Sequence, residues 1–334
     1  MDLVADQLLA HVPSGVAATD IAPDFRRVFG RWSFNADRVL NRHVFLPRVV
    51  RRAARQFDFV HVADHSYAHA VNAVPPGRAG VYCHDLDAFR CLLDPASEPR
   101  PWWFRRLARR TLRGLQNAAV VFHNTAEVGR QLLAAGLVPA ERLVHAPLGV
   151  STEFTPGPEA RESFLLHVGG NIPRKRLDVL LDVFAAVRGR VPGLRLVQVG
   201  GPWPPHLAAQ LERLGIGGDV TQVRDLTRHQ LADLYRRAAA VLVTSEAEGF
   251  GLPVVEALAC GASVVASDIP TLREAGGSVV TFCPVAAVAD WADAVTRVLT
   301  SGDPANSDNR LSHAARFTWA GHARIITAAY RALA

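Results

Sequence analysis

The sequence predicts an α/β protein built from two Rossmann-like halves, each with a parallel sheet. At 334 residues the chain exceeds the roughly 150 residues typical of one domain. Short apolar segments of strand length alternate with amphipathic segments of helix length, a pattern typical of parallel sheets covered by helices. This alternation runs in two series, separated by the turn-rich stretch 149–158, in which 155–158 is the expected linker.

The first series opens with a helix, because Leu3, Val4, Leu8 and Leu9 lie at helical spacing within 1–11. No strand precedes this helix, although an α/β domain usually begins with a buried strand and a glycine-rich turn. A chain shortened at its N-terminus would explain such a start. The strands expected next are 57–62, 80–83, 118–122 and 143–146, with helices at 101–115 and 125–135 among them.

The second series has the same alternation. Its expected strands are 164–168, 195–199, 220–223, 240–244 and 263–266, and its expected helices are 177–187, 205–214, 228–238, 253–260 and 286–299. We therefore predict one domain over 1–150 and a second over 151–316, with a ligand site in a cleft between them.

Composition excludes several classes of protein. Nearly half of the residues are apolar and no low-complexity tract is present, so a folded protein is expected. The apolar runs are far shorter than the roughly 20 residues that cross a bilayer, and acidic Asp2 and Asp6 do not fit a secretion signal. We expect a cytoplasmic protein. Its four cysteines show no metal-type spacing, so neither disulfides nor structural zinc are predicted.

Lys175 is the only lysine in a chain whose net charge is +6. Compositional bias toward arginine accounts for the overall pattern. An ammonium group is a compact point charge that a planar guanidinium does not replace. The single lysine therefore marks a candidate site.

The segment 245–261 is the most informative stretch of the sequence. Gly249 and Gly251 allow the backbone to approach a ligand closely, Pro253 suits the first turn of a helix, and Gly261 suits its C-terminal cap. The free amides at such a helix start favour an anion, and a diphosphate would fit.

Two carboxylates accompany this helix start. Glu248 lies in the loop and Glu256 follows eight positions later, so both could accept hydrogen bonds from sugar hydroxyls. Taken singly, a glutamate is more often a solvated surface residue than a ligand-binding one.

A second motif covers 167–176. Gly169 and Gly170 follow a predicted strand, and Arg174 and Lys175 precede a helix that starts at Leu177. Flexible turns, positive charge and a helix start together predict a phosphate-binding loop, although adjacent basic residues alone are usually a solvated face. In the first half, His84 and Asp85 follow the strand 80–83, at the end where ligands meet parallel sheets.

The segment 245–261, with Gly-Phe-Gly-Leu-Pro between Glu248 and Glu256, closely resembles the retaining glycosyltransferases of GT-B fold, specifically their family four. The resemblance implies a nucleotide-diphosphate sugar, such as a UDP- or GDP-sugar, as donor, with no cofactor and no metal. It implies that Glu256 binds the donor's ribose and Glu248 the transferred sugar. The amides of Phe250, Gly251 and Leu252 would lie against sugar and phosphate.

The same resemblance implies that Arg174 and Lys175 neutralise the departing diphosphate, and that His84 faces donor sugar and acceptor. Many relatives have an acidic residue where this chain has Ile172, so the local loop shape stays open. The last helix, from about residue 317 to 334, would return to the first domain. Asp85-Leu86-Asp87 also fits the two-aspartate manganese motif of other glycosyltransferases, but a three-residue pattern is weak.

The acceptor is less well defined than the donor, and a saccharide or a lipid-linked acceptor is expected. On the helix 101–115, one face carries Phe104, Leu107, Thr111 and Leu115, and the other face carries Arg105, Arg106, Arg109, Arg110 and Arg113. Such a helix could contact an anionic membrane at its inner face, or could simply cover the sheet. No nucleic-acid partner is expected, because no recognition motif accompanies the charge.

Two other functions remain open. A noncatalytic nucleotide-sugar-binding protein would share this fold and its phosphate loop. A nicotinamide-dependent oxidoreductase would need a G-x-G-x-x-G motif after a first strand, and the sequence has none.

Overall fold

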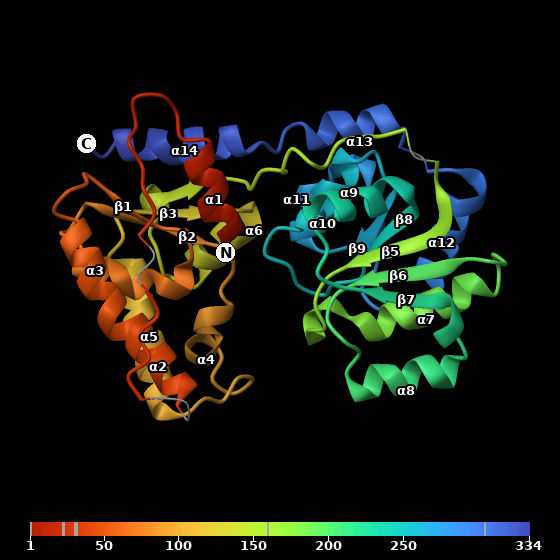
Figure 1. The fold of residues 1–334 in the computed structure, drawn as a ribbon, viewed down its shortest axis with the longest axis horizontal. Helices are drawn as coiled ribbons and strands as arrows, with labels where there is room; N and C mark the ends of the chain where they lie inside the picture. The colour runs from red at the N-terminus through yellow and green to blue at the C-terminus, as the bar shows by residue number, and fades with distance from the viewer. Residues whose placement is uncertain (1, 22–23, 30–32, 159, 304) are drawn as a thin grey trace. The chain divides into compact units, whose positions relative to one another are not determined.

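The computed structural model describes residues 2–21, 24–29, 33–158, 160–303 and 305–334, which form two compact units (Figure 1). Unit 1 comprises Met1–Leu148 together with Trp319–Ala334, and unit 2 comprises Gly149–Thr318. Each unit has a wholly parallel sheet with helices packed against it, so the predicted α/β fold class is confirmed.

Unit 1 contains a four-stranded sheet in sequential order. Its strands are β1 (Val60–Val62), β2 (Ala79–Cys83), β3 (Val120–His123) and β4 (Leu143–His145). Because all three pairings are parallel, with Cys83 opposite His123, the carboxyl ends of the strands meet at one edge. All four predicted strands of this half overlap observed ones.

The helices of unit 1 include a region that the sequence pattern missed. The first helix is α1 (Asp2–Ala10), as expected, while Met1 lies outside the described residues. Residues 34–53, given no element in the sequence analysis, form a continuous helical run of α2 (Phe34–Leu40), the π-helical turn η2 (Asn41–Phe45) and α3 (Leu46–Ala53). Pro47 interrupts the helical pattern in the sequence, and the π turn before it accommodates the missing N–H.

The remaining helices of unit 1 cover the two faces of its sheet. They are η3 (His65–Ala73), η4 (Asp87–Phe89), α4 (Arg90–Leu93), α5 (Trp102–Gln116), α6 (Ala126–Ala134), η5 (Ala140–Arg142) and α14 (Trp319–Arg331). Val81 of β2 packs in one core with Leu115 of α5, while Tyr82 contacts His322 of α14. Figure 1 accordingly shows α3 and α5 on one side of the sheet and α14 on the other.

The first turn of α5 departs from the predicted pattern. Thr111 and Leu115 are buried as a covering helix requires, but Phe104 is 37% exposed. Trp102 is 76% exposed, and Trp103, whose ring contacts that of Phe104, is 48% exposed. The N-terminal turn of α5 therefore presents three aromatic side chains to solvent.

Unit 2 contains a six-stranded sheet in the order β10-β9-β8-β5-β6-β7. The strands are β5 (Glu162–Val168), β6 (Arg195–Val199), β7 (Val220–Val223), β8 (Ala238–Val243), β9 (Val264–Ser267) and β10 (Thr281–Cys283). The chain adds strands on one side of β5 and then returns to add β8, β9 and β10 on its other side. The strand order thus reverses between β5 and β8, where ligands bind in doubly wound sheets.

Helices cover both faces of this sheet. They are α7 (Leu177–Arg188), α8 (Pro205–Leu214), α9 (Arg228–Arg237), α10 (Leu252–Ala259), α11 (Pro270–Gly276), α12 (Val288–Ser301) and α13 (Ser307–Ala314), with short turns η6 (Pro173–Lys175), η7 (Gly217–Asp219) and η8 (Gly277–Val279). The strand β10 and the helices α11 and α13 were not predicted.

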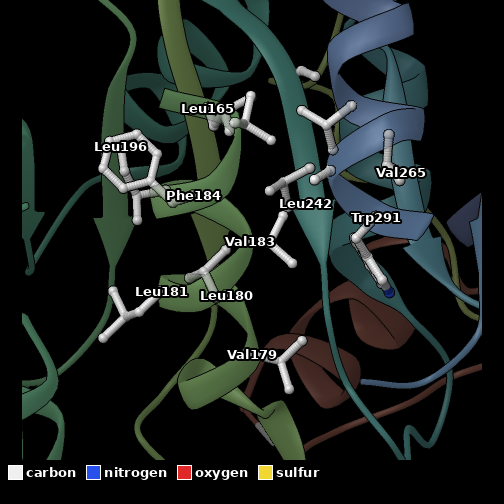
Figure 2. Close-up of a cluster of buried hydrophobic side chains, with 14 of the residues drawn as sticks. Leu165, Val179, Leu180, Leu181, Val183, Phe184, Leu196, Leu242, Val265 and Trp291 are labelled. Carbon is white, nitrogen blue, oxygen red and sulfur yellow. The ribbon is translucent and has the colours of Figure 1, made fainter. Parts of the chain in front are cut away.

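The core of unit 2 explains why its central elements could be predicted. Helix α7 buries Leu177, Leu180, Leu181 and Phe184 at a helical period. Figure 2 shows Phe184 next to Leu196 of β6, and Trp291 of α12 in the same buried cluster. Across the described part of the chain, no helix is both long enough and apolar enough to cross a bilayer.

Candidate active site

The candidate site of unit 2 is built by two loops that follow β5 and β8, at the reversal of strand order. The first loop, 169–176, leads into α7, and the second, 244–251, leads into α10. The two strands are directly paired, with Leu166 opposite Val241. Topology alone therefore brings the two predicted motifs together.

Glu248 is the centre of this site. Its Oε1 accepts hydrogen bonds from Lys175 Nζ at 2.5 Å and from Ser245 Oγ at 2.7 Å. Its Oε2 accepts one from Arg174 Nη1 at 3.2 Å. The Glu248 side chain is only 7% exposed and that of Lys175 11%, so two cations converge on one largely buried carboxylate.

Backbone contacts fix the two loops against each other. The amide of Glu246 donates to the carbonyl of Arg174 at 2.9 Å, and Thr244 Oγ1 donates to the carbonyl of Lys175 at 2.9 Å. Arg176 adopts a left-handed backbone conformation with φ of 49° and pairs with Asp178 and Glu246. The positions of Arg174 and Lys175 are therefore set by the protein before any ligand arrives.

Gly169 and His167 pack closely around the Lys175 side chain. A Cβ at Gly169 would lie 3.1 Å from the His167 ring and 3.4 Å from the Lys175 stem, so a larger residue would crowd both. Burial, together with the Lys175 ammonium, lowers the pKa of His167 to about 3, which keeps its ring neutral. Gly170 differs, because a Cβ there would meet open space.

The start of α10 borders the second loop. Gly251 has φ of 96°, and a Cβ there would also lie 2.9 Å from Leu272, so glycine is required at this turn. Leu252 begins the helix and Pro253 occupies its first turn, as predicted. Phe250 is buried with its ring 5.7 Å from that of Phe317. The turn is thereby held in place, and the free amides at the helix start carry partial positive charge.

Glu256 occupies a different environment from Glu248. Its Oε2 accepts a hydrogen bond from Tyr235 Oη at 3.1 Å. Burial raises the pKa of Glu256 to about 7, although the bond from Tyr235 and the charge of Arg228 oppose that rise. This carboxyl group therefore changes protonation near neutral pH.

Unit 1 has a polar cluster of its own at the carboxyl edge of its sheet. His65 follows β1, His84 and Asp85 follow β2, and Asn124 follows β3. The His84 amide donates to His65 Nδ1 at 3.3 Å, while His65 Nε2 lies 3.4 Å from Asp85 Oδ1. Asn124 Nδ2 donates to the His84 carbonyl at 3.1 Å. The predicted pair His84 and Asp85 thus belongs to a network over three neighbouring strands.

The protonation of this network follows from its surroundings. Burial lowers the pKa of His84, against the opposing effect of its 2.9 Å hydrogen bond to the Ala63 carbonyl. Burial alone would raise the pKa of Asp85, but hydrogen bonds from His65 and from the Asp87 amide outweigh it and lower that pKa. A neutral His84 therefore lies beside a charged Asp85.

Several residues of these two clusters escaped sequence reasoning. Thr244 follows β8 and bonds to the first loop, Ser245 bonds to Glu248 within the second loop, Tyr235 partners Glu256, and His65 partners Asp85. His65 could have been found, because it follows β1 as His84 follows β2. Within the described ranges, no group of three or more His, Cys, Asp or Glu side chains could hold a metal ion.

Comparisons with known proteins agree with this architecture. The family model described as Glycosyltransferase Family 4 matches residues 7–154, and that described as Glycosyl transferases group 1 matches residues 152–317. The chain is 34% identical over 226 residues to the D-inositol 3-phosphate glycosyltransferase of Mycolicibacterium smegmatis, covering 62% of this chain and 51% of that protein. The corresponding protein of Stackebrandtia nassauensis is 33% identical over 263 residues, covering 70% of this chain and 58% of the relative.

Solved structures share the fold. The Anabaena protein HepE in complex with UDP and glucose superposes with a TM-score of 0.72 at 20% identity, covering 88% of this chain and 83% of that one. Sucrose-phosphate synthase from Thermosynechococcus elongatus superposes with a TM-score of 0.68 at 20% identity, covering 86% of this chain and 79% of that one. The chain spans about half the length of the curated relatives it matches. Together, the two family models and the GT-B architecture show that this chain belongs to the family-four glycosyltransferases.

Proposed function

We propose that this chain acts in the retaining, metal-independent transfer of a sugar from a nucleotide-diphosphate donor to a saccharide or lipid-linked acceptor. The observation that carries the proposal is the convergence of Lys175 and Arg174 on one carboxylate beside the start of α10. Two fixed cations and a helix start form a site for the leaving diphosphate. Solved neighbours that contain UDP are consistent with such a donor.

The chemistry of the leaving group explains the need for these cations. Breaking the bond between sugar and diphosphate leaves negative charge on the phosphate oxygens, and preorganised cations stabilise it without rearrangement. Arg174 and Lys175, with the amides of Phe250, Gly251 and Leu252, would supply this stabilisation. Gly169 and Gly170 would let the backbone of the first loop approach the phosphates.

We infer retention from the resemblance to the family, and the state of Glu248 concerns the route, because it argues against an enzyme nucleophile. An enzyme carboxylate that attacks the anomeric carbon needs an available oxygen atom. Both oxygens of Glu248 already accept hydrogen bonds, from Lys175, Ser245 and Arg174, which makes this carboxylate a poor nucleophile. A mechanism in which the acceptor attacks the face that the diphosphate leaves needs no such nucleophile.

The remaining candidates would bind and position the substrates. Glu256 would accept hydrogen bonds from the ribose hydroxyls, and Glu248 would contact the transferred sugar as well as hold the cations. His84, kept neutral by burial, would position donor and acceptor without becoming charged, with Asp85 holding the loop through His65.

The acceptor is defined less narrowly than the donor. Relatives named D-inositol 3-phosphate glycosyltransferase suggest a polar saccharide-like acceptor with a phosphate group. A lipid-linked acceptor would place the protein at an anionic membrane surface, and the arginine face of α5, with Trp102 and Trp103 at its start, would suit such contact.

The proposal is tested by thermal shift with nucleoside diphosphates, followed by donor turnover. A diphosphate at 100 times its dissociation constant stabilises a protein by about 2.7 kcal/mol. We expect one diphosphate to raise the melting temperature of the wild type and of Arg224→Ala, which removes an exposed cation elsewhere in unit 2. Lys175→Ala should lose that response. No response of the wild type to any nucleoside diphosphate would refute the proposal.

The noncatalytic alternative is separated by turnover. A protein that only binds nucleotide sugars would show the thermal shift but would release no free diphosphate, with or without an acceptor. Release that depends on an added saccharide or lipid-linked acceptor, and a product with the donor's anomeric configuration by NMR, would establish retaining transfer. Unchanged turnover after prolonged chelation would support metal independence.

A further inference from the structure

A pocket on the helical layer of unit 1 lies outside both clusters described above. It has a volume of about 300 Å³, at the lower end of the range for small-molecule sites. Its lining comes from η2, α3 and α5, and consists of His43, Val44, Pro47, Arg48, Arg51 and Arg110. None of these residues belongs to the candidate active site.

The pocket is strongly basic and has no acidic residue in its lining. Arg48 and Arg51 come from α3, and Arg110 comes from α5. Within the part of the chain that the structure describes, none of the three pairs with a carboxylate. Between Arg38 and Phe57, and again over α5, the sequence contains arginines but no Asp or Glu. Arg48 Nη1 donates to the Val44 carbonyl at 3.1 Å, but three guanidinium groups without a carboxylate partner still leave the pocket positively charged, which attracts an anion.

His43 contributes a largely buried ring to this lining. Its side chain is buried, with 8% of the residue exposed, and its Nδ1 has no hydrogen-bond partner among the described residues. Burial, with the nearby charges of His69, Arg42 and Arg110, lowers the pKa of His43 to about 3. The neutral ring carries one N–H group and lies within a basic pocket.

We propose that this pocket binds a phosphate group. Guanidinium groups donate paired hydrogen bonds that match phosphate oxygens. Either a free phosphorylated molecule or the headgroup of a phospholipid could supply that group. This inference does not depend on the proposed sugar transfer, because none of the residues that line the pocket belongs to the two clusters proposed to bind donor and acceptor.

The decisive comparison uses two double variants with the same change in net charge. Arg51→Ala with Arg110→Ala removes two arginines of the pocket. Arg52→Ala with Arg109→Ala removes their exposed sequence neighbours, which do not line it. General electrostatic attraction would weaken equally in both, whereas a specific pocket would respond only to the first pair.

Binding of inorganic phosphate is measured by calorimetry, with a nucleoside diphosphate present to occupy the donor site. Each lost charge-assisted hydrogen bond reduces affinity about tenfold, so the Arg51/Arg110 pair should lose about a hundredfold and the Arg52/Arg109 pair less than about twofold. Equal losses in the two pairs, or no phosphate binding to the wild type, would overturn the proposal. Retained stabilisation by nucleoside diphosphate in both pairs would show that the donor site is intact.

A second arm identifies the source of the phosphate group. Phosphatidylcholine vesicles with and without phosphatidic acid are sedimented with the wild type and both double variants. Recruitment that requires phosphatidic acid, and that only the Arg51/Arg110 pair loses, supports the pocket and assigns a lipid headgroup. Phosphate binding without recruitment supports it and assigns a free phosphorylated ligand. Recruitment that both pairs lose equally contradicts a specific pocket and indicates only general attraction.

Discussion

Replacing Glu248 by glutamine should destabilise unit 2 far more than the same change at Glu246, two positions earlier. Glutamine keeps the size of the side chain but removes the charge that Lys175 and Arg174 share. The Lys175 side chain is 11% exposed, so its ammonium group would remain largely buried without a counter-charge. Glu246 pairs with Arg176, and its side chain is 45% exposed.

The magnitude follows from these exposures. Breaking a buried ion pair by removing one partner costs about 3 kcal/mol at the lower end of measured values. For a unit of the size of Gly149–Thr318, 1 kcal/mol lowers the melting temperature by about 2–4 °C, which predicts about 6–12 °C for Glu248→Gln. An exposed ion pair contributes about 0–1 kcal/mol to stability, so Glu246→Gln should lower the melting temperature by less than about 4 °C.

Calorimetry of the full chain measures both variants, and a third variant tests the reason for the loss. Lys175→Met with Glu248→Gln removes both charges, so it should be more stable than Glu248→Gln alone. Equal melting temperatures for the Glu248 and Glu246 variants would refute the reasoning. A double variant that is no more stable than Glu248→Gln would also refute it, since the buried ammonium group would then not be the cause of the loss.

Two further predictions concern pH and packing. Because the pKa of Glu256 is raised to about 7 from a usual 4.5, its stabilising effect should be complete below pH 4.5 and lost as pH rises to about 7. Urea unfolding over this range should therefore show a fall in the free energy of unfolding of up to about 3 kcal/mol as the pH rises. Glu256→Gln should abolish this fall. An identical fall in the variant would exclude the Glu256 carboxyl group as its source. Gly114→Ala would place a Cβ against the backbone carbonyl of Ala68 and should destabilise unit 1 by about 3 kcal/mol. Gly217→Ala, where a Cβ meets open space, should change stability by less than about 0.5 kcal/mol, and similar losses for the two variants would contradict the packing argument.

The sequence predicted the central elements of both sheets because their patterns are strong. The buried run of β5 and the helical period of α7 depend on local side-chain order, which is readable without tertiary contacts. The strand β10 was missed because it has three residues, of which only Cys283 is buried. The helical run 34–53 was missed because Pro47 looks like a helix break in the sequence. In the structure a π turn precedes Pro47, and the helical run continues through it.

The candidate site could be predicted as two motifs but not as one cluster. Sequence patterns placed Arg174 and Lys175 in one loop and Glu248 in another, more than 70 positions away. That these side chains pair depends on β5 and β8 being neighbours, which is a property of strand order rather than of either motif. Tyr235 was missed for the same reason, because it acts through a contact between α9 and α10.

The single lysine of the chain now has a structural explanation. Lys175 is enclosed by the His167 ring and Gly169 on one side and by Glu248 on the other. Its linear stem fits this narrow space and brings one compact charge to the carboxylate, whereas a guanidinium is planar and wider. Arg174, at the open side of the same carboxylate, is 31% exposed and follows the compositional bias of the chain. At this carboxylate the lysine therefore occupies the enclosed position and the arginine the position that reaches solvent.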